Sequence, residues 1–368
     1  MLSTVRFLAL ASIAFAAPQD IAFDAIDNAT QPSITGPPVG TDTQIIPLDV
    51  QAAVASVSAA VEATPLAVAV ARKRTLGFND PCGPQPDGYA PKPLVDTVSA
   101  FLAYPFYQTQ ATSAVTPQGY QRSFTNLQGS VNGKVYLGLY TLASYDTAQC
   151  SANCDATAGC AGFNLFFERD PTINPAPACP CPSSFTNAKC TLWGAGVTAA
   201  MAVNTGQYRE QFVVVITGSN GYNKVAAPPA QANFNGPVQL AGAINAPLLN
   251  GVDTYLGYKF FPTAFLPALC AAACQAQTAY DRATATNSVY KPANFYKPCN
   301  FFTAYIMSKN DRAQGLYCAL YTHAWDPSYA TNTGQFRGTD VYTISSAYSY
   351  TLTQQDSGVI SRRGLVGE

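Results

Sequence analysis

Cysteine and histidine are the side chains of this sequence with the greatest capacity for chemistry. The chain has eleven cysteines but only one histidine, His323. A serine or cysteine nucleophile needs a base beside it, and His323 precedes Ser328 by five residues without any further motif. Two Cys-x3-Cys pairs could hold zinc, but such thiols form disulfides in an oxidising compartment. We therefore expect no catalytic residues, no metal and no cofactor.

Paired carboxylates are the next candidates, because two of them can serve as acid and base or bind calcium. Glu168-Arg169-Asp170 places two carboxylates around one guanidinium in a chain with few charges. We expect Arg169 to keep both ionised and to oppose a raised pKa. The following Pro171 favours an ion pair at a turn over an acid–base site.

Charge and hydropathy exclude several classes of partner. The chain carries 20 basic and 21 acidic residues, so it lacks the basic field that nucleic acid requires. It contains neither a phosphate-binding glycine loop nor a basic stripe. No apolar run reaches the roughly 18 residues of a membrane span. We expect neither nucleic-acid binding nor membrane insertion.

The first 16 residues have the pattern of a secretory signal. Arg6 precedes the apolar run Phe7–Phe15, and Ala16 completes a small-residue cleavage site. The run is too short to span a bilayer. Residues 1–16 are therefore expected to be a signal peptide. This predicts a secreted, extracellular or cell-wall-associated protein.

Residues 17–74 differ from the rest of the chain because they contain no Cys, Tyr or Trp. A segment with so few large side chains cannot build much of a core. It ends at Arg72-Lys73-Arg74, which resembles the sites cut by kexin-type proteases. We expect a propeptide removed after Lys73 and Arg74. The alternative is a disordered linker that stays attached.

A duplication organises the rest of the chain. The pair Cys150 and Cys154 has the same spacing as Cys270 and Cys274. Fourteen residues after a later cysteine in each copy comes a six-residue segment, a hexad, in which five residues are identical. The two hexads are Asn204-Thr205-Gly206-Gln207-Tyr208-Arg209 and Asn332-Thr333-Gly334-Gln335-Phe336-Arg337. So many agreements in order indicate two diverged copies of one module.

Each copy predicts one helix and a small antiparallel sheet, so the fold class is α+β. The helices are expected over 146–156, with Asp146 as N-cap, and over 266–276. The polar insertion 278–297 is predicted to be a loop. The boundaries that follow are 75–130 for a lead-in segment, 131–225 for the first module, 226–250 for a linker, 251–350 for the second module and 351–368 for a flexible tail.

The cysteine helix, the Cys-x-x-Phe segment at 160–163 and the later Cys-x-Leu strand at 190–192 together resemble the apple/PAN module. The second copy repeats the pattern. Three longer strings are similar to a group of secreted proteins of filamentous fungi, for which no activity follows. These strings span 166–171, 217–222 and 329–335.

The apple/PAN resemblance implies nested bridges between each helix and later segments of its own module. The order of the cysteines agrees with that pattern. The implied pairs are Cys150–Cys190, Cys154–Cys160, Cys270–Cys318 and Cys274–Cys299.

Three cysteines remain outside this pattern. Cys179 and Cys181 are too close for an easy internal bridge. We expect Cys82 to pair with Cys179, with Cys181 as the alternative partner. The thiol left over, Cys181 in the first case, is expected to be buried and free, or to link two chains as a disulfide dimer.

The repeated hexads are the best candidates for a shared function. Amide and guanidinium groups donate hydrogen bonds to sugars and carboxylates, and two copies give avidity. The candidate ligand-binding residues are Asn204, Gln207, Arg209, Asn332, Gln335 and Arg337. The alternative is a glycine turn that leads into a strand. The sequence favours an extracellular binder of polysaccharide, glycan or protein at a cell surface or cell wall. A matrix protein without a soluble ligand is the alternative, and a secreted hydrolase is a remote one.

Overall fold

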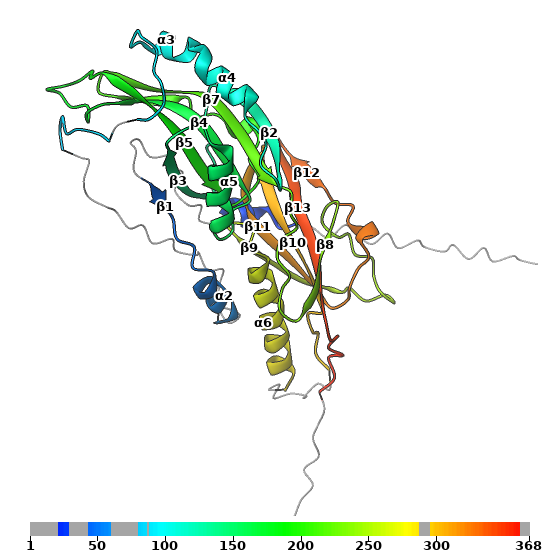
Figure 1. The fold of residues 1–368 in the computed structure, drawn as a ribbon. Coiled ribbons are helices and arrows are strands. Elements are labelled where there is room, and N and C mark those ends of the chain that lie inside the picture. The colour runs from blue at the N-terminus through cyan, green and yellow to red at the C-terminus, as the bar shows by residue number, and fades with distance from the viewer. Residues whose placement is uncertain (1–20, 29–42, 60–79, 87, 287–294, 361–368) are drawn as a thin grey trace, which may run out of the picture.

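The chain forms two antiparallel β-sheets with a few helices, an α+β architecture (Figure 1). The computed structural model describes residues 21–28, 43–59, 80–86, 88–286 and 295–360. The expected signal peptide, with Ala16, and the basic site at Lys73 and Arg74 lie outside these residues. None of the described helices has the length and apolarity that a membrane crossing requires.

The first unit is built on a sheet with the strand order β1-β3-β5-β4-β7-β2, and β6 pairs with β7. Strands β4 and β5 are buried along their whole length, which explains their continuous runs of bulky residues. Their register places Leu165 opposite Cys190. The strands are β1 (Gln44–Ile45), β2 (Tyr120–Leu127), β3 (Tyr136–Leu142), β4 (Gly162–Pro171), β5 (Ser184–Trp193), β6 (Gly206–Arg209) and β7 (Phe212–Lys224).

The second unit repeats this plan with the strand order β12-β13-β10-β11-β9, and β8 pairs with β13. Ala304 lies opposite Cys318, as Leu165 lies opposite Cys190. The strands are β8 (Phe234–Gln239), β9 (Tyr255–Phe261), β10 (Phe301–Lys309), β11 (Arg312–Tyr321), β12 (Gly334–Arg337) and β13 (Asp340–Leu352).

One cysteine-bearing helix packs on each sheet. Helix α5 (Thr147–Ala156) begins after Asp146, whose carboxylate accepts from the Gln149 amide at 2.9 Å, as the sequence predicts. Helix α6 (Pro267–Thr286) runs ten residues beyond the predicted end at 276. The loop expected from 278 is wrong in its first part, because residues 275–286 contain good helix formers and no glycine or proline.

Disulfides join each helix to the sheet beneath it. The structure contains the five pairs that were expected: Cys150–Cys190, Cys154–Cys160, Cys270–Cys318, Cys274–Cys299 and Cys82–Cys179. Ten of the eleven cysteines are thereby bonded. Cys181 is free and exposed, so the expectation of a buried thiol is wrong.

One hydrophobic cluster contains buried residues of both units, including the cysteines of α5 and α6. At their junction the Phe265 amide donates to the Gly194 carbonyl at 2.9 Å. A Cβ on Gly194 would lie 2.5 Å from the Cβ of Ala264. Only glycine permits this close approach.

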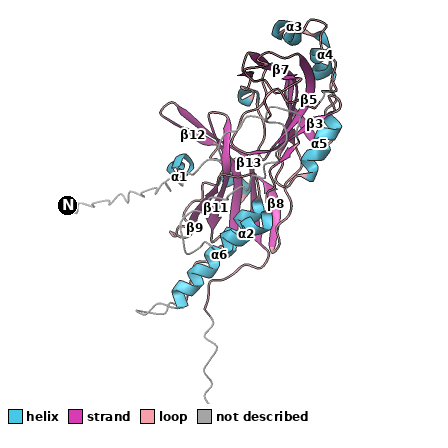
Figure 2. Ribbon diagram, turned by 90° about the vertical axis from the view of Figure 1, so that its left-hand side faces the viewer, coloured by secondary structure: helices cyan, strands magenta, loops and turns pink. Residues whose placement is uncertain are grey.

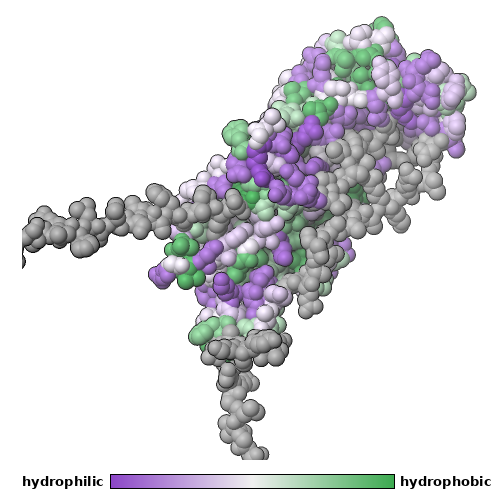
Figure 3. All heavy atoms as spheres, turned by 180° about the vertical axis from the view of Figure 1, so that it is seen from behind, coloured by the Kyte–Doolittle hydropathy of each residue, from purple (hydrophilic) through white to green (hydrophobic). Residues whose placement is uncertain are grey.

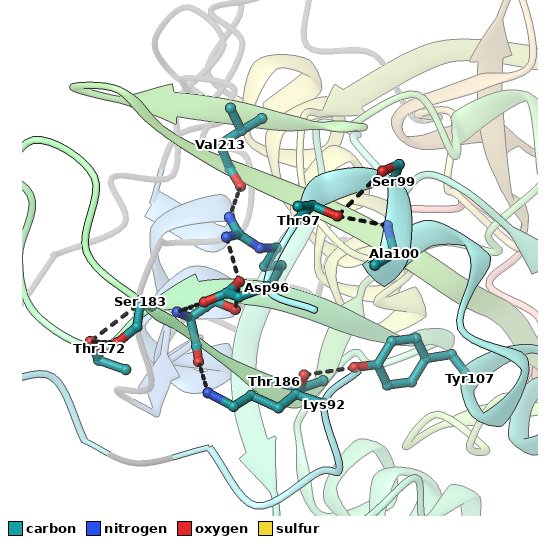
Figure 4. Close-up of polar contacts among 12 residues, drawn as sticks. Lys92, Asp96, Thr97, Ser99, Ala100, Tyr107, Thr172, Ser183, Thr186 and Val213 are labelled. Atoms are coloured by element: carbon teal, nitrogen blue, oxygen red, sulfur yellow. Dashed lines mark hydrogen bonds and ion pairs between the residues drawn. The ribbon is translucent and has the colours of Figure 1, made fainter. Parts of the chain in front are cut away.

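The lead-in segment is fastened to the ends of β4 and β5 (Figure 4). The Asp96 carboxylate accepts from Arg169 at 2.7 Å and from the Ser184 amide at 2.7 Å. Tyr107 is hydrogen-bonded to Thr186 across 2.7 Å. The segment also contributes α3 (Val98–Ala103), α4 (Pro105–Ser113) and strand β2.

Parts of the predicted propeptide pack on the body of the protein. Helix α1 (Phe23–Asn28) joins the second unit's core, β1 pairs with β3, and α2 (Val50–Ala59) contacts α6. The described parts of 17–74 therefore differ from a disordered linker. These described parts need few large side chains of their own, because they pack against hydrophobic clusters formed mainly by the two units.

Two further boundaries are corrected by strand pairing. The predicted linker 226–250 contains β8, which completes the second sheet. The predicted tail 351–368 is ordered through residue 360, where Asp356 accepts from Tyr296 at 2.7 Å. The sequence concealed β8 because a Gly-Pro pair interrupts it, although proline is tolerated in an edge strand.

Candidate functional site

The two hexads form matching hairpins, β6–β7 and β12–β13. Asn204 Oδ1 accepts from the Gly206 amide at 3.2 Å, and Asn332 Oδ1 accepts from the Gly334 amide at 3.1 Å. These bonds hold the turn that leads into each short strand. Asn204 and Asn332, predicted as ligand-binding residues, therefore already have a structural role.

The glycines of the hexads are required by close packing. Gly206 has φ +114°, and a Cβ there would lie 2.0 Å from the Val214 carbonyl oxygen. Gly334 has φ +125° with the same 2.0 Å approach to the Tyr342 carbonyl oxygen. The alternative of a glycine turn leading into a strand is therefore correct for the first half of each hexad.

The fourth and fifth residues of each hexad are exposed to solvent. Gln207 and Gln335 are exposed. The aromatic residue beside each of them is also highly exposed, with Tyr208 77% and Phe336 78% exposed. Sequence reasoning had selected the amides and arginines. The signal for the rings was the aromatic residue shared at the fifth position of both hexads.

The two hexad arginines have different environments. Arg209 is half-buried and donates from Nη2 to Asn174 Oδ1 at 2.6 Å. Burial lowers the pKa of Arg209, while the nearby Asp170 and Glu168 oppose that change. Arg337 is exposed and pairs with Asp24 of α1 at 3.0 Å.

The triplet Glu168-Arg169-Asp170 lies within strand β4 and forms no turn. Successive strand residues point to opposite faces, so Arg169 reaches Asp96 on one face. Glu168 and Asp170 share the other face, where Lys189 pairs with both and lies 3.1 Å from Asp170 Oδ2. The expectation that Arg169 holds both carboxylates is therefore wrong.

Burial and the close neighbours of this cluster change the pKa values of Glu168 and Lys189. Burial and the neighbouring Asp170 raise the pKa of Glu168 to about 8. Burial opposes the charged form of Lys189, but Asp170 and Glu168 raise its pKa overall. The sequence prediction of an unraised pKa is therefore wrong for Glu168. Both carboxylate side chains are less than 5% exposed, which leaves them poorly placed to reach a substrate.

A cleft of about 970 Å³ separates the two units on another side. Its walls include Tyr120, Phe265 and Tyr348, together with the ion pair of Lys224 and Asp155 at 3.0 Å. Beyond this pair the walls carry the Asp311 side chain and several Ser, Thr, Asn and Gln side chains, so the cleft has a mixed polar and apolar surface. Figure 3 shows the face opposite Figure 1, where hydrophobic and hydrophilic residues are interspersed.

The remaining chemical candidates do not assemble into a centre. The His323 ring packs edge-on against Trp325 with centroids 5.3 Å apart. Within the described part of the chain, no three His, Cys, Asp or Glu side chains gather as metal ligands would. Comparison of the chain with protein-family models, curated proteins and solved structures gave no match.

Proposed function

We propose that this chain is a secreted, non-catalytic binding protein that recognises a glycan at a cell surface or cell wall through its two hexad hairpins. The observation that carries the proposal is the exposed aromatic ring at the same position of both hairpins. Single exposed hydrophobic residues are common on protein surfaces, but an exposed aromatic residue at the same position of both hairpins favours a ligand surface that the two copies share. Aromatic faces stack on pyranose rings, and the adjacent amides of Gln207 and Gln335 can bind hydroxyls.

Secretion and module type belong to the same proposal. Five disulfides are compatible with an extracellular protein. A cysteine-bearing helix bonded to a sheet in each unit supports the apple/PAN resemblance. The carboxylates of Glu168 and Asp170, the strongest candidates for hydrolysis, are buried and ion-paired. This favours binding over hydrolysis.

Retention on insoluble cell-wall polysaccharides tests the proposal. We expect Tyr208→Ala and Phe336→Ala each to weaken retention and the double variant to abolish it, because two sites give avidity. Tyr89→Ala removes an aromatic ring that is 70% exposed elsewhere and serves as the matched control. Retention of the folded double variant at the wild-type level would refute glycan binding by the hairpins.

The exposed thiol of Cys181 favours a second candidate function, that of a matrix or cell-wall component joined by intermolecular disulfides. Such a protein should resist extraction until it is reduced. Cys181→Ser should make it extractable without reductant, whereas it should leave glycan retention unchanged.

A further inference from the structure

Helix α1 and Ile21, two residues before it, insert three apolar side chains into the second unit. Ile21, Phe23 and Ile26 are 8%, 4% and 0% exposed. They join a cluster of buried aromatic residues from β10, β11 and β13. Figure 2 shows α1 beside β12 and β13. Without residues 21–28, the part of this aromatic cluster that they cover would be exposed to solvent.

Polar contacts fix the position of α1 as closely as the apolar ones do. Tyr342 donates to both oxygens of the Asp27 carboxylate, at 2.9 and 2.8 Å. Lys309 Nζ reaches the same carboxylate at 3.1 Å and Asp340 at 2.9 Å. The Ala22 amide donates to the Tyr317 hydroxyl at 3.2 Å.

The opposite end of the contact is made by a hexad residue. Arg337 pairs with Asp24 at 3.0 Å and lies over the Phe23 ring at 5.2 Å. Both acidic residues of α1 thus face cations of the second unit. A six-residue helix is marginal alone. The helix therefore depends on the apolar and ionic contacts that the surface beneath it supplies.

Further basic residues lie beside the docked helix α1. A polar pocket of about 740 Å³ beside α1 is lined by Lys134, Lys309 and Arg312, and Asp27 is the one carboxylate among its lining residues. Burial and the neighbouring Lys309 lower the pKa of Lys134. Loss of α1 would leave these cations with less compensating charge.

We propose that this helix-docking face, formed by Tyr317, Tyr342, Lys309 and Arg337, binds an acidic amphipathic helix of a partner protein, and that residues 21–28 occupy it in the uncleaved chain. The proposal goes beyond glycan binding. It also means that Arg337 becomes available to any ligand only after α1 leaves. The partner's helix must carry an aromatic residue and two carboxylates at the spacing of Phe23, Asp24 and Asp27.

The test uses the full chain with its own segment displaced. In the variant Phe23→Ala/Ile26→Ala, α1 loses its apolar anchors. A fluorescently labelled peptide with the sequence of residues 19–30 should bind this variant, and it should bind the wild-type chain at least about tenfold more weakly, because the face is occupied there. Fluorescence anisotropy measures both affinities.

Specificity is tested on both sides of the contact. A peptide with Asp27→Asn, or a variant chain that also carries Lys309→Ala, should bind at least about tenfold more weakly. Lys224→Ala removes a lysine from a different ion pair and should change nothing. A second displaced chain, Asp27→Asn, keeps the apolar anchors in case the double variant fails to fold.

Two results would overturn the proposal. One is the absence of peptide binding to a natively folded displaced chain, and the other is equal binding of the Asp27→Asn peptide. Binding of an acidic oligosaccharide at this face in place of the peptide would also refute a protein partner. Failure here leaves retention through Tyr208 and Phe336 unaffected, so the two proposals are distinguishable.

Discussion

Arg209 and Arg337 occupy the same position of the two repeats but contact different parts of the chain. Arg209 Nη2 donates to Asn174 within its own unit, whereas Arg337 Nη1 reaches Asp24 in the N-terminal segment. Both copies therefore keep the hairpin, but the arginine at its end has a different role in each copy. One arginine bonds within its own unit, and the other contacts the N-terminal segment.

This difference predicts unequal stability effects. Arg209→Ala should lower the free energy of unfolding by about 1 kcal/mol, because a half-buried charged hydrogen bond is lost. Arg337→Ala should change it by less than about 0.5 kcal/mol, since the pair with Asp24 is exposed. Urea unfolding of the uncleaved chain measures both. Equal effects would contradict the assignment.

The raised pKa of Glu168 predicts a pH dependence of stability. The folded state keeps this proton up to about pH 8, whereas the unfolded state loses it near its ordinary value. The folded state therefore binds more protons in between, and stability falls as pH rises from about 5 to 8, by at most about 1.4 kcal/mol per pH unit.

Glu168→Gln should flatten this dependence. Urea unfolding at several pH values between 5 and 8 gives the slope for each protein. Glu210→Gln, at an exposed glutamate, is the control and should keep the wild-type slope. An unchanged slope in Glu168→Gln would show that the cluster around Lys189 does not hold the proton.

The disulfides should contribute differently to the free energy of unfolding, because they close loops of different length. Cys150–Cys190 closes 40 residues and Cys154–Cys160 closes six. Replacing both cysteines by alanine should cost about 4 kcal/mol for the first and about 2 kcal/mol for the second. Thermal and urea unfolding of the two double variants measure these losses. A larger loss for the Cys154–Cys160 variant would contradict the prediction.

Gly334 and Gly338 offer a matched pair of substitutions. Gly334→Ala places a Cβ against the Tyr342 carbonyl oxygen and should cost at least about 2 kcal/mol. Gly338 also has positive φ, but nothing lies within 4 Å, so Gly338→Ala should cost only about 1 kcal/mol. Melting temperatures compare the two variants. Similar losses would mean that the carbonyl can move away.

The odd cysteine should react in the native state. One thiol per chain is expected to titrate with a membrane-impermeant disulfide reagent in the absence of denaturant, because Cys181 is exposed. Cys181→Ser should reduce the count to zero and remove any dimer seen on a non-reducing gel. A dimer that persists in this variant would require a different link.

The cysteine pattern predicted more of the fold than the polar residues did. The repeated Cys-x3-Cys spacing marked both helices, and the nested bridges that the apple/PAN resemblance implied are present. The sequence led to a wrong interpretation of Glu168, Arg169 and Asp170, because it does not show that strand β4 continues through them. The alternation along that strand decides which face of the sheet each side chain occupies. The packing of Phe23 and Ile26 was also hidden, since their binding surface is formed by strands about 280 to 320 residues later.

The contact of Gly194 with Ala264 sets a constraint on ligands. A Cβ at Gly194 would lie 2.5 Å from the Cβ of Ala264, so the two units are in close contact there. We expect this contact to restrict changes in the separation of the Tyr208 and Phe336 rings. Under the proposed glycan function, a chain-like ligand would engage both rings only when the distance between its recognised sugars matches that span, so we expect selection for repeat length as well as for sugar chemistry.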